Sequence, residues 1–206
     1  LGLVGSEMCI RDRYLTRDKG LIMKPEINFC LDAYVDADFA GRWHKAYSHL
    51  RDSVLSRTGF VLTFCNCPVF WVSKLQTEVA LSTTEAEYMA LSHCMRELIP
   101  MRRLIEEIGD SSFIQGMAAN SSHISTKTLS VSRVFEDNQS CIAVATAEQF
   151  CPQTKHISCK YHFFRDHLGT TANIVPVKSS ENLADIFTKP LACQKFEYLR
   201  RLLMGW

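Results

Sequence analysis

The segment from Ile27 to Asp38 constrains the fold most, because its residues alternate with the period of a β-strand. One face of this segment is apolar, and the other carries Asp32, Tyr34, Asp36 and Asp38. An apolar strand face has to be buried, so the chain must supply further strands and helices to cover it. The strand also ends in acids, which places carboxylates at an edge of the expected sheet.

The rest of the chain predicts a regular order of elements from its periodicity, caps and turn residues. We expect a β-hairpin at 58–74, a long helix at 82–109, a strand at 130–137 and two helices at 138–147 and 154–168. A further strand is expected at 172–179, followed by two short helices at 181–189 and 194–204. The long helix is expected to kink or restart at Pro100, because proline lacks the backbone N–H that a helix needs. This order predicts an α/β, or layered α+β, domain in which helices cover a mixed sheet.

Composition limits the class of protein. With 206 residues and 47% hydrophobic content, the chain can bury one core, so we expect one domain. A net charge of +1 gives no global attraction to nucleic acid, so any such binding must use a local patch. The nine scattered cysteines, without a signal-peptide pattern, predict reduced thiols in an intracellular protein. No apolar run of about 18 residues occurs, so no membrane span is expected.

Two segments are set apart from the expected core. Residues 1–13 contain the string SEMCIRDR, which resembles the translation of a sequencing-library adapter. The alternative is a natural disordered arm, and neither interpretation gives the segment a function. Residues 109–130 are rich in Ser, Thr, Asn and Gly without a sustained period, which predicts a surface loop.

Four acids lie where predicted elements begin or end: Asp36, Glu87, Asp137 and Asp185. Such positions are where an α/β sheet presents groups to ligands. Hard divalent cations such as Mg²⁺ prefer carboxylate oxygens and keep places for water and phosphate. Two such ions about 3.5 to 4 Å apart can activate a water on one side of a phosphodiester and stabilise the leaving oxygen on the other. Position alone is a weak indication, because most exposed acids are only solvated charges.

Six motifs, in this order along the chain, resemble the ribonuclease H region of copia-type LTR retrotransposon Pol polyproteins. They are YVDADFAG at 34–41, SRTGFV at 56–61, WVSKLQTEVALSTTEAEYMALS at 71–92, EDNQS at 136–140, TKHI at 154–157 and ENLADIFTKPL at 181–191. The resemblance implies a ribonuclease H-like fold, with a mixed five-stranded sheet flanked by helices, over residues 29–191. It makes residues 14–28 the tail of the reverse transcriptase connection, and residues 192–206 a C-terminal helix and polyprotein end.

The resemblance also assigns the site. It implies that Asp36, Glu87, Asp137 and Asp185 are both the catalytic acids and the ligands of two Mg²⁺ ions, for which Mn²⁺ can substitute. Glu85 is a competitor of Glu87, but the two lie about 200° apart around the helix, so both cannot face one metal pair. We expect Glu85 to cap the helix instead.

Two further residues stand near the expected site. Asp38 falls on the same strand face as Asp36, which makes it a candidate outer partner. Some cellular relatives of the family carry a mobile histidine between the last strand and the final acid. Residues 177–182 contain no histidine, so Lys178 is the candidate to replace it, unless nothing does.

The histidines and cysteines between 151 and 162 allow two interpretations. Cys151, His156, Cys159 and His162 are residue types that bind zinc, but their spacing fits no common zinc pattern and one helix face would not hold them all. We therefore favour a basic surface that faces phosphates. The predicted nucleic-acid-binding residues are Lys155, His156, Lys160, Arg165 and Lys178.

The reaction that the resemblance implies is hydrolysis of the RNA strand of an RNA:DNA hybrid during reverse transcription. The expected partners are the hybrid and the reverse transcriptase domain of the same polyprotein, in the cytoplasm within virus-like particles or in the nucleus. Two rivals are a catalytically inactive remnant that binds nucleic acid or acts as a scaffold, and an integrase core. The helix motif at 84–92 and the ending ADIFTKPL at 184–191 speak against the integrase.

Overall fold

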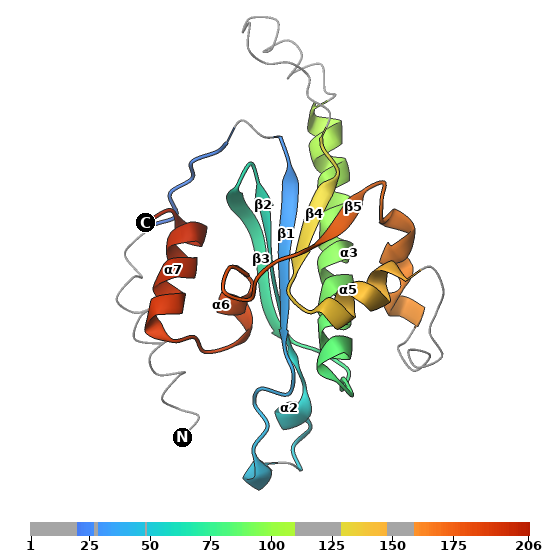
Figure 1. Cartoon of the computed structure of the whole chain (residues 1–206), viewed down its shortest axis with the longest axis vertical. Coiled ribbons are helices and arrows are strands. Elements are labelled where there is room, and N and C mark those ends of the chain that lie inside the picture. The colour runs from blue at the N-terminus through green and yellow to red at the C-terminus, as the bar shows by residue number, and fades with distance from the viewer. Residues whose placement is uncertain (1–19, 27–28, 48, 110–128, 148–158) are drawn as a thin grey trace, which may run out of the picture.

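The computed structural model describes residues 20–26, 29–47, 49–109, 129–147 and 159–206. Five strands form one sheet in the order β3-β2-β1-β4-β5 (Figure 1). They are β1 (Leu31–Asp38), β2 (Arg57–Phe64), β3 (Cys67–Leu75), β4 (Ser132–Glu136) and β5 (Ala172–Pro176). β2 pairs antiparallel with both β1 and β3, whereas β4 pairs parallel with both β1 and β5. The expected mixed five-stranded sheet, and with it the α/β fold class, is confirmed.

The hairpin of β2 and β3 closes through a two-residue turn. Cys65 and Asn66 both have a positive φ, of 51° and 64°. This conformation gives a tight turn whose twist matches that of the flanking strands. The sequence predicts the turn at 66–68, but the structure places it one residue earlier and includes Pro68 in β3.

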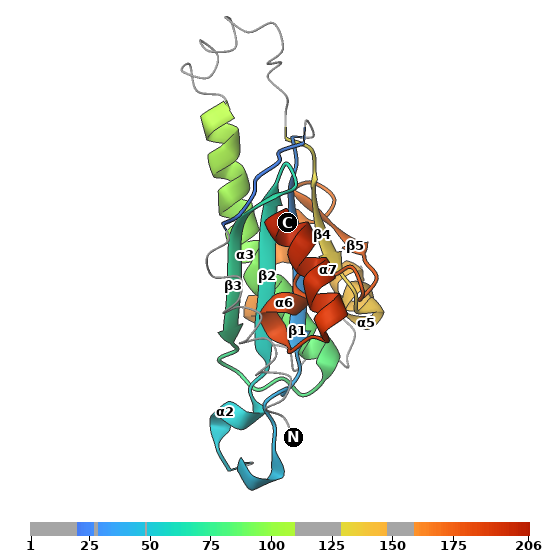
Figure 2. The same ribbon diagram turned by 90° about the vertical axis from the view of Figure 1, so that its left-hand side faces the viewer.

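Helices cover both faces of the sheet (Figure 2). α3 (Thr83–Gly109) and α5 (Gln139–Thr146) lie on one face, and α6 (Asp185–Thr188) and α7 (Cys193–Met204) lie on the other. Alternation along the strands explains the two layers, because Leu62 joins the core cluster under α3 whereas Val61 joins the cluster under α7. A short helix, α2 (Arg51–Val54), and a 3-10 turn, η1 (Lys45–Tyr47), stand between β1 and β2.

Two expectations about helices meet a different structure. Of the kink or restart expected at Pro100, the restart does not occur, because α3 continues through Pro100 as one helix. The helix expected at 154–168 is absent from its described part, which forms two 3-10 helices, η3 (Cys159–Tyr161) and η4 (Phe163–His167). Tyr161 at the end of η3 and Phe164 in η4 are both buried and belong to the core cluster under α3. Residues 154–158 lie outside the described part of the chain.

The two ends of the described chain, residues 20–22 and 204–206, are joined by hydrogen bonds. The Trp206 indole N–H donates to the Gly20 carbonyl at 2.7 Å, and the Ile22 N–H donates to the Met204 carbonyl at 3.0 Å. Residues 1–13 and most of the loop expected at 109–130 lie outside the described residues. Among the residues that are described, no helix combines the length and apolar composition that crossing a membrane requires.

Candidate metal centre

Asp36 lies near the end of β1, the central strand, and is 1% exposed. Its carboxylate accepts hydrogen bonds from two side chains, one at the last residue of α6 and one at the residue that follows α6. The Thr188 hydroxyl donates to Asp36 Oδ2, and the Lys189 ammonium donates to Asp36 Oδ1 at 3.1 Å. The strand and the α6 segment, which are far apart in sequence, therefore build this part of the site together.

The loop before α6 is fixed to β1 by Asn182. Asn182 is fully buried, and its amide donates to the Val35 carbonyl at 2.7 Å. Its side-chain oxygen accepts from the Ala184 N–H at 3.1 Å. These two bonds set Asp185, the first residue of α6, beside the residue that follows Val35 in β1.

Gly59 lets α6 lie directly on the sheet. It pairs with Asp36 in the β1–β2 register. A Cβ atom built at Gly59 would stand 2.5 Å from Thr188 Cγ2 and 2.9 Å from Phe187 Cβ, which is too close for any real contact. A side chain at this position would therefore push α6 away from Asp36.

Asp185 is fully buried, and two lysines neutralise it. Lys189 Nζ lies 2.7 Å from Asp185 Oδ1, and the Lys195 ammonium pairs with Oδ2. Lys189 also pairs with Asp36, so one ammonium bridges two carboxylates. We refer to Asp36 and Asp185 with these two lysines as the lysine-paired half of the site.

The start of α3 sets the position of Glu87. Ser82 accepts from the Glu85 N–H at 3.1 Å, and the Glu85 carboxylate accepts from the Leu81 N–H at 2.7 Å. Glu85 thus caps the helix, as expected, and is turned away from the site. Glu87 lies further along the same turn and is 7% exposed.

Gln76 ties this helix start to the sheet. It is buried just beyond β3, and its amide donates to the Ala86 carbonyl at 2.8 Å and to the Thr58 hydroxyl at 3.1 Å. The bond to Ala86 holds the backbone directly before Glu87. Glu87 is therefore positioned by a side chain from the far edge of the sheet.

The end of β4 supplies two adjacent acids. Glu136 is the last strand residue and is fully buried, and Asp137 follows it. Asn138 caps α5, because its side chain accepts from the Cys141 N–H at 3.0 Å. The sequence allowed either Asp137 or Asn138 as this cap, and the structure assigns Asn138. Glu136 Oε1 accepts from the Asn138 N–H at 3.1 Å.

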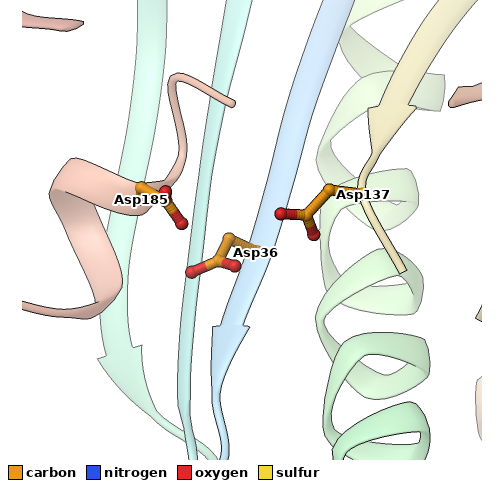
Figure 3. Close-up of side chains that lie close together, drawn as sticks. All are labelled: Asp36, Asp137 and Asp185. Atoms are coloured by element: carbon orange, nitrogen blue, oxygen red, sulfur yellow. The ribbon is translucent and has the colours of Figure 1, made fainter. Parts of the chain in front are cut away.

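The carboxylates converge in two groups that share Asp137. One oxygen each of Asp36, Asp137 and Asp185 lies within 4.8 Å of the others (Figure 3). One oxygen each of Glu87, Glu136 and Asp137 meets the same limit. Since β1 and β4 are parallel neighbours, their carboxyl ends meet at one edge, and this brings the acids together.

We refer to Glu87 and Glu136 as the unpaired half of the site. Oε2 of each is buried and makes no hydrogen bond among the described residues. Buried charges are normally neutralised or hydrogen-bonded, so these two oxygens need an explanation. An open depression of about 530 Å³ leads to the cluster, and Asp36, Glu87, Asp137 and Lys189 are among its lining residues.

Burial and crowding raise the pKa of three acids in the cluster. Burial raises the pKa of Asp36 to about 6, although Lys189 opposes the rise. Burial, with the neighbouring Glu136, raises the pKa of Glu87 to about 11. Burial raises the pKa of Glu136 to about 8, against the hydrogen bond from Asn138. Near neutral pH and without a cation, the unpaired half therefore holds protons.

Asp38 lies in an outer position. It is half-buried, lines the same depression and, in the described part of the chain, belongs to neither group of three acids. Burial raises its pKa, whereas Lys189 and Arg57 oppose the rise.

Three of the five predicted nucleic-acid-binding residues belong to the described chain, and they lie in different surroundings. Lys155 and His156 lie outside the described residues. Lys160 is exposed and pairs with Glu78, and Arg165 lines a separate hollow beside α5. Lys178 is exposed and directly precedes Ser179, which lines the acidic depression. Of the three that are described, Lys178 alone is next to a lining residue of the acidic depression.

Sequence reasoning missed three residues of the site. Glu136 could have been suspected, because it adjoins Asp137 where a strand was expected to end. Lys189 follows Asp185 by four residues, which on a helix places both on one side. Lys195 gave no signal, because its contact with Asp185 depends on how α7 returns to the sheet.

No protein-family model matches the chain. Among curated proteins, it is similar to the retrovirus-related Pol polyprotein from transposon TNT 1-94 of Nicotiana tabacum, with 32% identity over 176 residues, or 84% of this chain. It is also similar to the corresponding polyprotein from transposon RE2 of Arabidopsis thaliana, with 31% identity over 192 residues, or 92% of this chain. The chain spans only 11% and 12% of the length of these two relatives.

Among solved structures, the chain resembles LC11-RNase H1, isolated from compost by a metagenomic approach. The TM-score is 0.48 and the identity 15%, over 79% of this chain and 94% of the other. A crystal structure of the same protein in complex with an RNA/DNA hybrid gives a TM-score of 0.47 at 14% identity, over 77% of this chain and 93% of the other. RNase H1 from the halophilic archaeon Halobacterium salinarum gives a TM-score of 0.46 at 15% identity, over 77% of this chain and 94% of the other.

Proposed function

We propose a nuclease function for this chain, which is homologous to one segment of the retrovirus-related Pol polyproteins of plant transposons and fits the ribonuclease H domain of a copia-type element. The reaction is metal-dependent hydrolysis of the RNA strand of an RNA:DNA hybrid during reverse transcription. The observation that carries the proposal is the convergence of Asp36, Asp137 and Asp185 within 4.8 Å, with Glu87 in a second group that shares Asp137.

The donor set suits Mg²⁺ and accepts Mn²⁺. All the ligand candidates are carboxylate oxygens, which hard divalent cations prefer over nitrogen or sulfur. The two groups of three acids share Asp137, so two cations would lie side by side with Asp137 between them. The buried oxygens without a partner on Glu87 and Glu136 also fit a site completed by a cation.

Bound cations would supply a nucleophilic water at neutral pH and would stabilise the leaving oxygen of the phosphodiester. The four acids would hold these ions at the open depression, where a phosphate of the hybrid can approach. Lys189 would release Asp36 and Asp185 when cations bind, and its ammonium then remains at the rim of the depression to meet the phosphate. The products implied by the family resemblance are a 5′-phosphate and a 3′-hydroxyl.

The hybrid would be recognised by shape and by its backbone. The 2′-hydroxyls in the wide minor groove distinguish RNA from DNA, while the DNA strand is held through phosphates. Lys160, Arg165 and Lys178, with Lys155 and His156, are the proposed phosphate contacts. The net charge of +1 is small, so we propose that the reverse transcriptase of the same polyprotein adds further contacts, in cytoplasmic virus-like particles or in the nucleus.

The division of the chain follows the same proposal. Residues 29–191 form the nuclease domain, residues 14–28 are the tail of the reverse transcriptase connection, and residues 192–206 carry a further helix.

A cleavage assay tests the proposal. The chain is incubated with Mg²⁺ and a labelled RNA:DNA hybrid, an RNA duplex, or a DNA duplex that carries processed ends. We expect cuts in the RNA of the hybrid alone, and none after Asp36→Asn. A folded parent that binds the hybrid but cuts nothing would identify an inactive remnant, and preference for DNA ends would identify an integrase.

A further inference from the structure

Glu136 is a fifth acid at the site and lies deeper than the other four. It is fully buried at the end of β4, and one of its oxygens lies within 4.8 Å of oxygens from Glu87 and Asp137. Its Oε1 accepts from the Asn138 N–H at 3.1 Å. Its Oε2 is buried and makes no hydrogen bond among the described residues, and the same holds for Glu87 Oε2.

This arrangement is costly unless a positive charge enters it. A buried carboxylate without a partner costs several kcal/mol, or else takes up a proton. In the described part of the chain, the lysines at the cluster pair with Asp36 and Asp185 and not with these two glutamates.

The separation of the oxygens suits a small divalent cation. Mg²⁺ binds oxygen at about 2.1 Å in an octahedron, so two opposite ligands lie about 4.2 Å apart. Oxygens that already lie within 4.8 Å of one another would need only small side-chain movements to reach this geometry.

We propose that Glu136, with Glu87 and Asp137, forms a cation position that fills before the position at Asp36 and Asp185. At the unpaired half, a cation would break no ion pair to a described lysine, and two buried carboxylate oxygens without a partner face it. At the lysine-paired half, it has to displace Lys189 and Lys195 from Asp185. This inference rests on the proposed metal-dependent function and adds a ligand and an order of binding to it.

The test is direct binding of Mn²⁺, measured from the electron paramagnetic resonance signal of the free ion. We expect the parent to bind two ions with different affinities. Glu136→Gln should weaken the tighter position by roughly 10- to 100-fold, the usual effect of losing a group that supports a metal site. Asp185→Asn should weaken the looser position and leave the tighter one unchanged.

Two controls separate ligation from folding. Glu97→Gln removes an exposed acid of α3 and should bind both ions as the parent does. Glutamine at 136 retains the oxygen that accepts from Asn138, so the melting temperature without metal should not fall. If it does fall, Glu136→Asp, which keeps the charge but shortens the side chain, should still weaken the tighter position.

The outcomes distinguish the two proposals. If the parent binds no Mn²⁺ and cuts no hybrid, the proposed function fails and this inference fails with it. If the parent binds two ions and cuts the hybrid, but Glu136→Gln and Glu136→Asp bind both ions like the parent, only this inference is overturned. Loss of the tighter position in Asp185→Asn would overturn the order of binding.

Discussion

The two halves of the acidic site neutralise their charge in different ways. On the lysine-paired half, Lys189 and Lys195 pair with Asp36 and Asp185, which are 1% and 0% exposed. On the unpaired half, Glu87 and Glu136 are also buried, and their pKa values are raised. Bound protons therefore neutralise these two carboxylates, as lysines neutralise the carboxylates of the other half. Asp137 lies between the halves and belongs to both groups of acids.

The difference shows what each half must give up when a cation binds. The lysine-paired half exchanges an ammonium for the metal, and Lys189 stays charged near neutrality because Asp36 and Asp185 raise its pKa, although burial opposes the rise. Asp36, whose pKa burial raises to about 6, adds a dependence on pH mainly below pH 7. The unpaired half exchanges protons for the metal, so its affinity must increase with pH. Two adjacent positions on one fold should therefore respond differently to the same solution.

The largest effect is expected at the residue that both halves share. Asp137→Asn keeps the shape of the side chain but is a poorer ligand, so hybrid cleavage should fall by orders of magnitude. Like charges about 4 Å apart repel by roughly 4 kcal/mol at an effective dielectric near 20, before relaxation and proton uptake. The metal-free variant should therefore melt at the same temperature as the parent or higher.

Melting curves with and without Mg²⁺, paired with a cleavage assay, check this expectation. Mg²⁺ should raise the melting temperature of the parent more than that of the variant. Asp166→Asn, at an exposed acid, is the matched control. A variant that loses stability yet cuts normally would show that Asp137 has only a structural role.

Next in size is the loss of the bridging lysine. Lys189→Met leaves Asp36 and Asp185 buried with one fewer counter-charge, which should cost about 3 kcal/mol without metal. Mg²⁺ should restore more stability in this variant than it adds to the parent. Urea unfolding with and without Mg²⁺ measures both effects.

Lys160→Met is the matched control for this lysine. Lys160 pairs with Glu78, but both side chains are 45% exposed, so its loss should cost far less stability than the loss of Lys189. Equal losses in the two variants would contradict the idea that Lys189 compensates for buried charge.

A smaller change tests how α6 is placed. Gly59→Ala should cost about 1 to 3 kcal/mol, because the new Cβ would clash with Thr188 and Phe187. The displacement should weaken Mn²⁺ binding at the lysine-paired half and spare the unpaired half. Gly20→Ala is the control, since a Cβ there meets nothing within 4 Å. Equal weakening of both positions would mean that the halves are not separable.

A final effect is a dependence of stability on pH. The folded pKa values of Glu87 and Glu136, about 11 and 8, lie above the unfolded value of 4.5. The folded state therefore holds more protons between pH 5 and 8, and the metal-free protein should lose stability as pH rises through this window. Each proton contributes at most about 1.4 kcal/mol per pH unit.

Urea unfolding at pH 5, 6, 7 and 8 with EDTA measures this slope. Glu87→Gln should flatten it, whereas Glu97→Gln, at an exposed acid of α3, should keep it. A parent whose metal-free stability rises from pH 5 to 8 would contradict the raised pKa values.

The sequence predicted most of the sheet, because strand periodicity and helix caps are local signals. The four acids that it singled out lie close together in the structure, in two groups that share Asp137. The five strands and the capping role of Glu85 could be expected from a few neighbouring residues each. Glu136 was missed at the cluster, although it adjoins Asp137, since alternation along a strand would turn the two side chains apart. β4 ends at Glu136, so Asp137 leaves the strand geometry and both carboxylates can reach Glu87.

The contact between Lys195 and Asp185 could not be predicted from the sequence for a related reason. Lys195 meets Asp185 only because α7 packs against the sheet through a small core that contains Val61, Phe196 and Leu199. The 3-10 turns at 159–167 were also missed, because the pattern of buried aromatics there depends on contact with α3. Tyr88 of α3 packs against Phe164, with ring centroids 5.4 Å apart. Long-range packing of this kind leaves no short motif in the sequence.

The hydrogen bond between Trp206 and Gly20 has a consequence for engineering. Because the described chain starts and stops at neighbouring points, a short glycine-rich linker can join these points without stretching. New ends could then be opened at the Cys65–Asn66 turn, giving a circular permutant in which β3 becomes the first strand. Such a permutant would keep every contact of the acidic cluster while changing the order in which the ribosome delivers its strands.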